Sequence, residues 1–98
     1  MSIMFLRLLY NLMYKLEWEH DMKLNEAIGK RIETIFQERG LSGYKVAKLG
    51  GVPKQVIYSI LKCEYKKISI DVIYQITATL DMSLEEFFSD PMFGDISD

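Results

Sequence analysis

Residues 41–60 decide the fold, and they read LSGYKVAKLGGVPKQVIYSI. Ser42 is a residue type that begins helices, because its side-chain oxygen accepts a hydrogen bond from a backbone N–H of the first turn. Gly50-Gly51 breaks that helix, and Pro53 suits the first turn of the next one, where its missing N–H has no helical partner. The stretch therefore predicts two short helices joined by a tight glycine turn.

Apolar residues at helical spacing predict three more helices around this pair. Before it, Asn25 can cap a helix that Gly40 ends in the left-handed conformation. Behind it, Ser69 or Asp71 can begin a fourth helix, and Ser83 opens a short fifth one with a capping box. The inward positions are Ile28, Ile32, Ile35, Phe36, Val46, Ala47, Val56, Ile57, Ile60, Leu61, Ile70, Ile73, Ile76, Leu80, Leu84, Phe87 and Phe88. We therefore expect an all-α fold.

The size and composition of the chain argue against an enzyme. A chain of 98 residues, 49% of them hydrophobic, forms one domain and uses most of its apolar residues for its own core. The sequence holds no Ser/His/Asp or Cys/His set and no phosphate-binding glycine loop. Cys63 is the only cysteine, which excludes a disulfide within the chain. It lies far from the only histidine, His20, without the spacing of a four-ligand zinc site. We expect no catalytic residue, no metal and no cofactor.

The net charge of −2 conceals an uneven distribution along the chain. Residues 39–67 hold seven Lys and Arg against Glu64 alone, which makes this segment +6. Residues 68–98 hold seven Asp and Glu and no Lys or Arg, which makes them −7. Because the local field steers a charged partner, the basic middle segment is the candidate surface for an anionic one.

Residues 3–16, IMFLRLLYNLMYKL, form the most apolar stretch. They are fewer than the ~20 residues that a membrane span needs, and Arg7, Asn11 and Lys15 interrupt them. One interpretation is an amphipathic helix that docks on the domain or on a second copy of it. The other is that translation begins at Met22, because the codons of Trp18 and Glu19 form a purine-rich run where a bacterial ribosome-binding site would lie. We divide the chain into an apolar extension, a domain and a short tail, at residues 1–21, 22–90 and 91–98.

The central pattern resembles the Cro and lambda-repressor class, the XRE-type transcriptional regulators. The resemblance joins the helix-turn-helix of residues 41–60 to ISIDVIYQI at 68–76 and LDMSLEEFF at 80–88, and so covers residues 25–89. It implies a five-helix, lambda-repressor-like DNA-binding domain, to which the apolar amino-terminal segment is extra. Ala47 then lies where the two motif helices approach closely, and Gly51 supplies a positive φ in the turn.

The resemblance also implies roles for the outer face of the second motif helix, which lies in the major groove. The base-reading candidates are Lys54, Gln55, Tyr58 and Ser59, since Gln suits adenine and Lys suits guanine. For Tyr58 the contact is either a thymine methyl or a phosphate. The candidates for phosphate contacts are Gly43, Tyr44, Lys45, Lys48, Lys62, Lys66 and Lys67. Other interpretations stay open: Tyr44 and Tyr58 as partly buried packing residues, Lys66 and Lys67 as solvated loop lysines, and Cys63 as a tolerated small residue or a redox switch.

Five positions depart from the family's usual pattern. Gly43 stands where relatives often have a Gln that grips a phosphate, and Tyr58 replaces a small residue. Pro53 stands where many relatives have Ser, and Lys62-Cys63 replaces Asn-Gly, so both ends of the second motif helix are capped differently.

From the resemblance we expect a sequence-specific double-stranded DNA-binding transcriptional regulator, a small cytoplasmic repressor of bacterial or phage type. It binds an inverted repeat as a homodimer, with half-sites about one helical turn apart. No membrane and no small-molecule ligand is expected. The alternative is a protein-interaction module, antitoxin-like or binding an anti-repressor, whose DNA contact Gly43 weakens. The dimer candidates are Phe87, Phe88, Met92 and Phe93, with the amino-terminal stretch as a second possibility.

Overall fold

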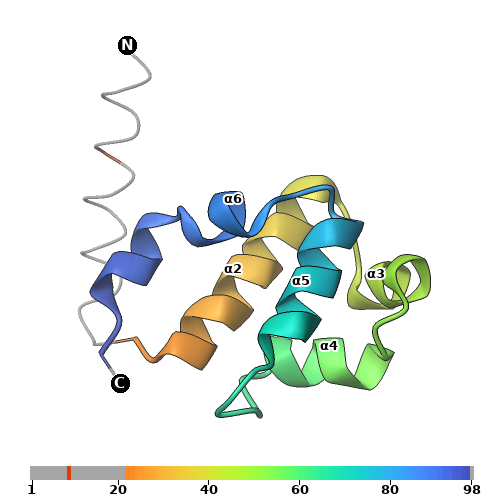
Figure 1. Cartoon of the computed structure of the whole chain (residues 1–98), viewed down its shortest axis with the longest axis horizontal. Helices are drawn as coiled ribbons and strands as arrows, with labels where there is room; N and C mark the ends of the chain where they lie inside the picture. Colours follow the sequence, from red (N-terminus) through yellow and green to blue (C-terminus); the bar gives the residue numbers. More distant parts are fainter. Residues whose placement is uncertain (1–8, 10–21, 98) are drawn as a thin grey trace.

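The computed structural model describes residue 9 and residues 22–97 (Figure 1). The described helices are α2 (Leu24–Arg39), α3 (Gly43–Gly50), α4 (Lys54–Leu61), α5 (Ile70–Thr79), α6 (Leu84–Phe88) and the 3-10 helix η1 (Pro91–Asp95). The prediction of an all-α fold is confirmed. The predicted apolar extension at residues 1–21 lies outside the described residues, apart from Leu9, which is helical and exposed.

Three serines begin helices as their side chains predict. The Ser42 hydroxyl accepts the Lys45 N–H at 3.1 Å, and the Ser69 hydroxyl accepts the Asp71 N–H at 3.2 Å. The Ser83 hydroxyl accepts a backbone N–H in the first turn of α6 at 3.0 Å, which completes its half of the predicted capping box. These bonds satisfy donors that have no acceptor within their own helix, and so fix where each helix starts.

Helix α2 begins differently from the expectation. Its N-cap is Lys23, whose N–H donates to the Glu26 carboxylate at 3.3 Å. Asn25, the predicted cap, lies inside the helix, and its Nδ2 donates to the Tyr65 carbonyl at 2.9 Å. The amide of Asn25 therefore ties α2 to the loop between α4 and α5 instead of capping its own helix.

The helices enclose one main core, and glycines allow them to pack closely. Its buried residues are Ile28, Ile32, Ile35, Phe36, Val46, Val52, Ile57, Ile60, Ile73, Ile76, Leu80 and Phe87. A methyl group on Gly29 would lie 2.7 Å from the Ile60 carbonyl oxygen, and one on Gly50 would lie 2.1 Å from the Thr79 hydroxyl. Ala47 is half-buried against this core. Backbone contact between α2 and α4 therefore depends on Gly29, a glycine inside a helix.

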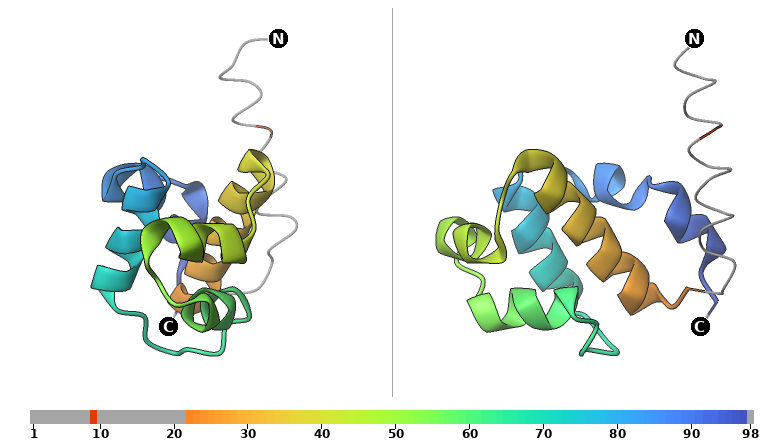
Figure 2. Two further views of the ribbon diagram at one scale, coloured as in Figure 1. Left: turned by 90° about the vertical axis from the view of Figure 1, so that its right-hand side faces the viewer. Right: turned by 180° about the vertical axis from the view of Figure 1, so that it is seen from behind.

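The carboxyl-terminal residues fold onto α2, which corrects the predicted tail at 91–98. Met92 is only 2% exposed and forms a second buried cluster with Met22 and Ala27. Ile96 pairs with Met22 as a parallel bridge, and the Ser97 N–H donates to the Met22 carbonyl at 3.1 Å. The folded unit thus extends past residue 90, and its carboxyl end lies beside the start of α2 (Figure 2).

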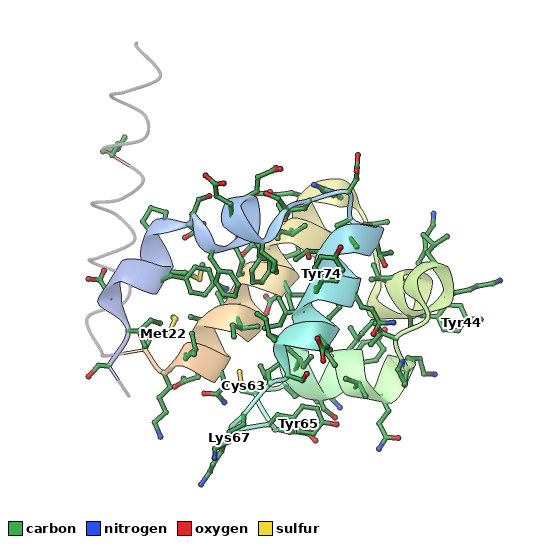
Figure 3. The ribbon with its side chains drawn as sticks, viewed as in Figure 1. Met22, Tyr44, Cys63, Tyr65, Lys67 and Tyr74 are labelled. Carbon is green, nitrogen blue, oxygen red and sulfur yellow. The ribbon has the colours of Figure 1, made fainter. Side chains whose placement is uncertain are left out.

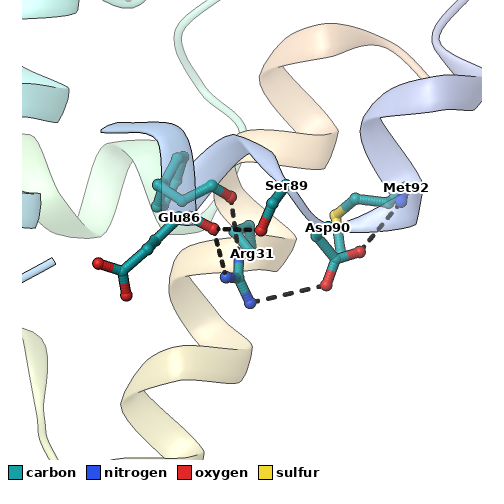
Figure 4. A network of polar contacts seen from close by, with 6 residues as sticks. Arg31, Glu86, Ser89, Asp90 and Met92 are labelled. Carbon is teal, nitrogen blue, oxygen red and sulfur yellow. Dashed lines mark hydrogen bonds and ion pairs between the residues drawn. The ribbon is translucent and has the colours of Figure 1, made fainter. Parts of the chain in front are cut away.

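One arginine holds this carboxyl-terminal part in place (Figure 4). The Arg31 guanidinium donates to the carbonyls of Phe87 at 2.9 Å and Glu86 at 3.1 Å, and lies 3.6 Å from the Asp90 carboxylate. These acceptors lie at the end of α6 and at the cap of η1. A planar guanidinium can serve all three acceptors at once, so Arg31 joins three elements.

Two of the four predicted dimer residues are not available for an interface. Phe87 is 0% exposed and Met92 is 2% exposed, because Arg31 and η1 cover this end of the core. Phe88 and Phe93 are half-buried and pack edge to face with centroids 5.0 Å apart. The apolar spacing of this segment reflects packing within the chain, which corrects the prediction for Phe87 and Met92.

Candidate nucleic-acid interface

Helices α3 and α4 form the predicted helix-turn-helix, at one end of the molecule (Figure 1). Gly51 ends α3 with a φ of 74°, and its N–H donates to the Ala47 carbonyl at 3.0 Å. Val52 follows in the turn and is buried, so it anchors the turn in the core. The positive φ explains why a glycine stands here, since other side chains are strained in that conformation.

The start of α4 presents polar side chains to solvent. Lys54 and Gln55 are both exposed, on the outer face that the sequence predicts for them. Tyr58, one turn further, is half-buried. Ser59 is only 8% exposed, which corrects its placement on the outer face. It lies one residue before the buried Ile60, and the helical twist turns it toward the core, so its hydroxyl does not share the surface of Lys54.

The starts of α3 and α4 are in direct contact with each other. Gly43 is buried, and a methyl group on it would lie 3.0 Å from Cζ of Tyr58 and 3.2 Å from Cγ2 of Ile57. Tyr44 is exposed, and the Lys54 ammonium lies 5.7 Å from the centroid of its ring, within range of a cation–π interaction. Tyr44 and Lys54 therefore form a patch across the two helices, and Tyr58 packs on Gly43, the residue before Tyr44.

The predicted phosphate-contact lysines extend this patch on both sides. Lys45 and Lys48 are exposed on α3, Lys62 is exposed where α4 ends, and Lys66 and Lys67 are exposed in the following loop. Figure 3 shows Lys67 and Tyr65 in that loop, below the helices, and Tyr44 at the outer end of α3. The acidic residues of α6 and η1 belong to elements on the other side of α2 and α5 (Figure 1). The described surface is thus basic along the helix-turn-helix and acidic behind it.

The residue that follows α4 has an unusual backbone conformation. Cys63 has a φ of 59°, in the left-handed region that favours glycine. Its thiol has a raised pKa, because partial burial disfavours the thiolate and the carboxylates of Glu26 and Glu33 repel it. The Glu64 N–H donates to the Ser59 carbonyl at 2.9 Å, so the chain reverses here as it does at a glycine cap.

Sequence reasoning missed several exposed apolar side chains. Ile70 and Tyr74 are 56% and 61% exposed on α5, and Leu49 is 67% exposed on α3. The prediction that Ile70 points inward, which follows from its apolar spacing with the rest of α5, is wrong. Its position as the first residue of that helix leaves it outside the core, which helical periodicity alone does not reveal.

Other kinds of site are not found in the part of the chain that the structure describes. Between residues 22 and 97, no three His, Cys, Asp or Glu side chains gather where they could hold a metal ion. No described helix is both long enough and apolar enough to cross a membrane.

Comparison with known proteins gives one family and two relatives. The family model for the Cro/C1-type helix-turn-helix (HTH) DNA-binding domain matches residues 31–91. The HTH-type transcriptional regulators PuuR of Escherichia coli strain K12 and PuuR of Shigella flexneri are each 37% identical to this chain over 67 residues. That match covers 66% of this chain and 35% of each relative, so the chain spans only a minor part of their length. No solved structure matches the chain.

Proposed function

Because this chain belongs to the Cro/C1-type HTH DNA-binding domain family, we propose that it is a sequence-specific, double-stranded DNA-binding transcriptional regulator. The observation that carries the proposal is the start of α4, where Lys54 and Gln55 are exposed. The same helix-turn-helix carries the exposed lysines Lys45, Lys48 and Lys62. The relatives are transcriptional regulators by name, which supports regulation of transcription as the purpose of binding. The proposal involves no catalytic step.

In this proposal Lys54 and Gln55 read base edges in the major groove. A glutamine can make two hydrogen bonds to adenine, and a lysine can donate to the O6 and N7 of guanine. The exposed lysines Lys45, Lys48, Lys62, Lys66 and Lys67 contact phosphates and set the register of α4 on the duplex. The burial of Ser59 argues against including it among the base-reading residues.

We further propose that the protein is a repressor and binds an inverted repeat as a homodimer. One α4 of eight residues reaches only a few base pairs, and two copies across a two-fold axis double the sequence that is read. Sedimentation velocity with and without an operator duplex tests the stoichiometry. Two protomers per inverted repeat support the dimer, and one protomer per site contradicts it.

Salt-dependent DNA binding tests the proposed function. Wild-type protein should select a preferred site from random duplex DNA and bind it more weakly as salt increases. The charge reversal Lys54→Glu should abolish that preference. The matched control is Lys30→Glu on α2, whose side chain pairs with Glu33 at 3.8 Å, and it should retain the preferred site. Equal binding by wild type and Lys54→Glu, or no DNA binding at low salt, would contradict the proposal.

A further inference from the structure

The ring of Tyr58 occupies the space that a side chain at residue 43 would need. A methyl group on Gly43 would lie 3.0 Å from Cζ and 3.3 Å from Cε1 of Tyr58, closer than most carbon contacts allow. Both atoms belong to the outer end of the ring, and Cζ carries the hydroxyl group. The glycine at 43 and the bulky side chain at 58 both depart from the family pattern, and in the fold these two residues contact each other.

This contact places the hydroxyl end of Tyr58 at the start of α3. Gly43 is the first residue of α3, and the first N–H groups of a helix have no acceptor within it. The Ser42 hydroxyl accepts one of them, the Lys45 N–H, at 3.1 Å. The ring of Tyr58 thus ends beside the first residue of α3, and the next residue, Tyr44, has the Lys54 ammonium 5.7 Å from its ring centroid.

The same contact turns the ring of Tyr58 toward α3 and not along the exposed tip of α4. Lys54 and Gln55, at the tip of α4, are exposed, whereas Tyr58 is half-buried against α3. A side chain packed on the neighbouring helix reaches the surface between the two helices. In a helix-turn-helix that docks by α4, the strand backbone passes over this surface.

We propose that Tyr58 contacts a DNA phosphate through its hydroxyl, from a place that only glycine at position 43 leaves open. This inference rests on the proposed function, and it assigns backbone contact instead of base reading to Tyr58. It also makes positions 43 and 58 a coupled pair, in which one residue or the other can be large but not both.

The variant Tyr58→Phe isolates the hydroxyl, because it keeps the ring that packs on Gly43. Its affinity should fall by about threefold to tenfold, the value of one hydrogen bond. The decrease should be the same on the preferred site and on a scrambled duplex, since a phosphate contact carries no sequence information. Gln55→Ala is the comparison, and it should lower affinity for the preferred site only.

The coupling is tested with Gly43→Gln, Tyr58→Ala and the double variant, each compared with wild type for melting temperature and for DNA affinity. Gly43→Gln alone should lower both, because the new side chain clashes with the ring. Tyr58→Ala should lower affinity, and the double variant should restore both properties toward wild type. Additive decreases in the double variant would overturn the coupling.

The outcomes separate this inference from the proposed function. If Tyr58→Phe binds like wild type, or changes the preferred sequence, the phosphate role is wrong while DNA binding stands. If wild-type protein binds no duplex, the proposed function fails and the phosphate role fails with it. The melting temperatures of the free variants still decide whether residues 43 and 58 are coupled.

Discussion

Cys63 and Asp81 adopt a conformation that their side chains disfavour. Their φ angles are 59° and 54°, and both residues follow a helix that ends with a reversed turn. Gly40 holds the same conformation after α2, with a φ of 64°. A side chain with a Cβ costs about 1–2 kcal/mol there, because Cβ approaches the following carbonyl oxygen. Gly51 holds the same conformation after α3, with a φ of 74°, so the fold keeps strain at two of four such positions.

Substitution of Cys63 by glycine should release part of this strain. We expect Cys63→Gly to raise the free energy of unfolding by about 0.5–1 kcal/mol, after the greater flexibility of glycine in the unfolded chain is subtracted. Cys63→Ala is the control, because it removes the thiol but keeps Cβ, and it should bring no gain. Urea unfolding of both variants measures the difference. A glycine variant no more stable than the alanine variant would refute the strain.

The raised pKa of the Cys63 thiol predicts slow reaction with alkylating agents. The thiolate is the reactive form, and a higher pKa leaves less of it at neutral pH. Iodoacetamide should therefore modify the folded protein more slowly than the urea-unfolded chain at the same pH, and the folded rate should increase at a higher pH than that of the unfolded chain. Glu33→Gln removes one repelling charge and should shift the folded profile toward lower pH. Identical profiles in the two states would contradict the prediction.

At the scale of elements, α2 and α4 pack closely because Gly29 has no side chain. Alanine normally stabilises a helix by about 1 kcal/mol relative to glycine. At Gly29 the added methyl would meet the Ile60 carbonyl oxygen at 2.7 Å, so we expect Gly29→Ala to destabilise the fold by about 1–3 kcal/mol. Gly94→Ala is the control, because nothing lies within 4 Å of its added methyl. In thermal unfolding, Gly29→Ala should have a lower melting temperature than wild type, and Gly94→Ala should not.

Arg31 should contribute more stability than any surface ion pair of the described chain. Replacement by methionine removes the guanidinium from the carbonyls of Glu86 and Phe87 and from the Asp90 carboxylate. We expect Arg31→Met to lower the free energy of unfolding by about 2–3 kcal/mol, the range for hydrogen bonds to a charged group. Glu33→Gln breaks the exposed ion pair with Lys30 and should change the free energy of unfolding by less than about 1 kcal/mol. Equal effects would show that the Arg31 network is dispensable.

The elements themselves could be predicted from local chemistry. The serines at positions 42, 69 and 83 and the glycines at 40 and 51 mark helix ends because the signal lies within a few residues of the effect. Asn25 fails as a predicted cap because its amide finds Tyr65, 40 residues away. The prediction that Ser59 lies on the outer face is wrong because a helix buries a wider arc of its surface than its apolar residues alone indicate. Such errors occur where a partner distant in sequence decides the outcome.

At the scale of the whole molecule, the separation of charge should govern binding to DNA. The slope of log affinity against log salt changes by about 0.9 for each phosphate that a protein neutralises. Replacing Lys62, Lys66 and Lys67 together by glutamine should flatten that slope by about 0.9 for each phosphate that these lysines bind in the wild type. Glu85→Gln on α6 changes the net charge far from the basic patch and should leave the slope unchanged. A filter-binding titration at several salt concentrations distinguishes local contacts from net charge.

The arrangement of the whole chain is less accessible to prediction than its elements. The lysines of α3, α4 and the following loop lie on other elements than the acidic residues of α6 and η1, because consecutive helices stay together. The burial of Phe87 and Met92 is not evident from the sequence, since apolar residues near a chain end look the same whether they pack inward or await a partner. The contact of Tyr58 with Gly43 is hidden for a related reason: the two departures are 15 positions apart in the numbering, and only the fold brings them together.

The pairing of Met22 with Ile96 brings the two ends of the folded unit to a single corner. A loop of a larger protein could therefore lead into the domain and leave it almost at the same point. The host's own backbone would hardly be displaced by such an insertion, and the exposed start of α4 lies on other elements from this junction. Residues 22–97 thus have the end-to-end geometry that domain insertion requires.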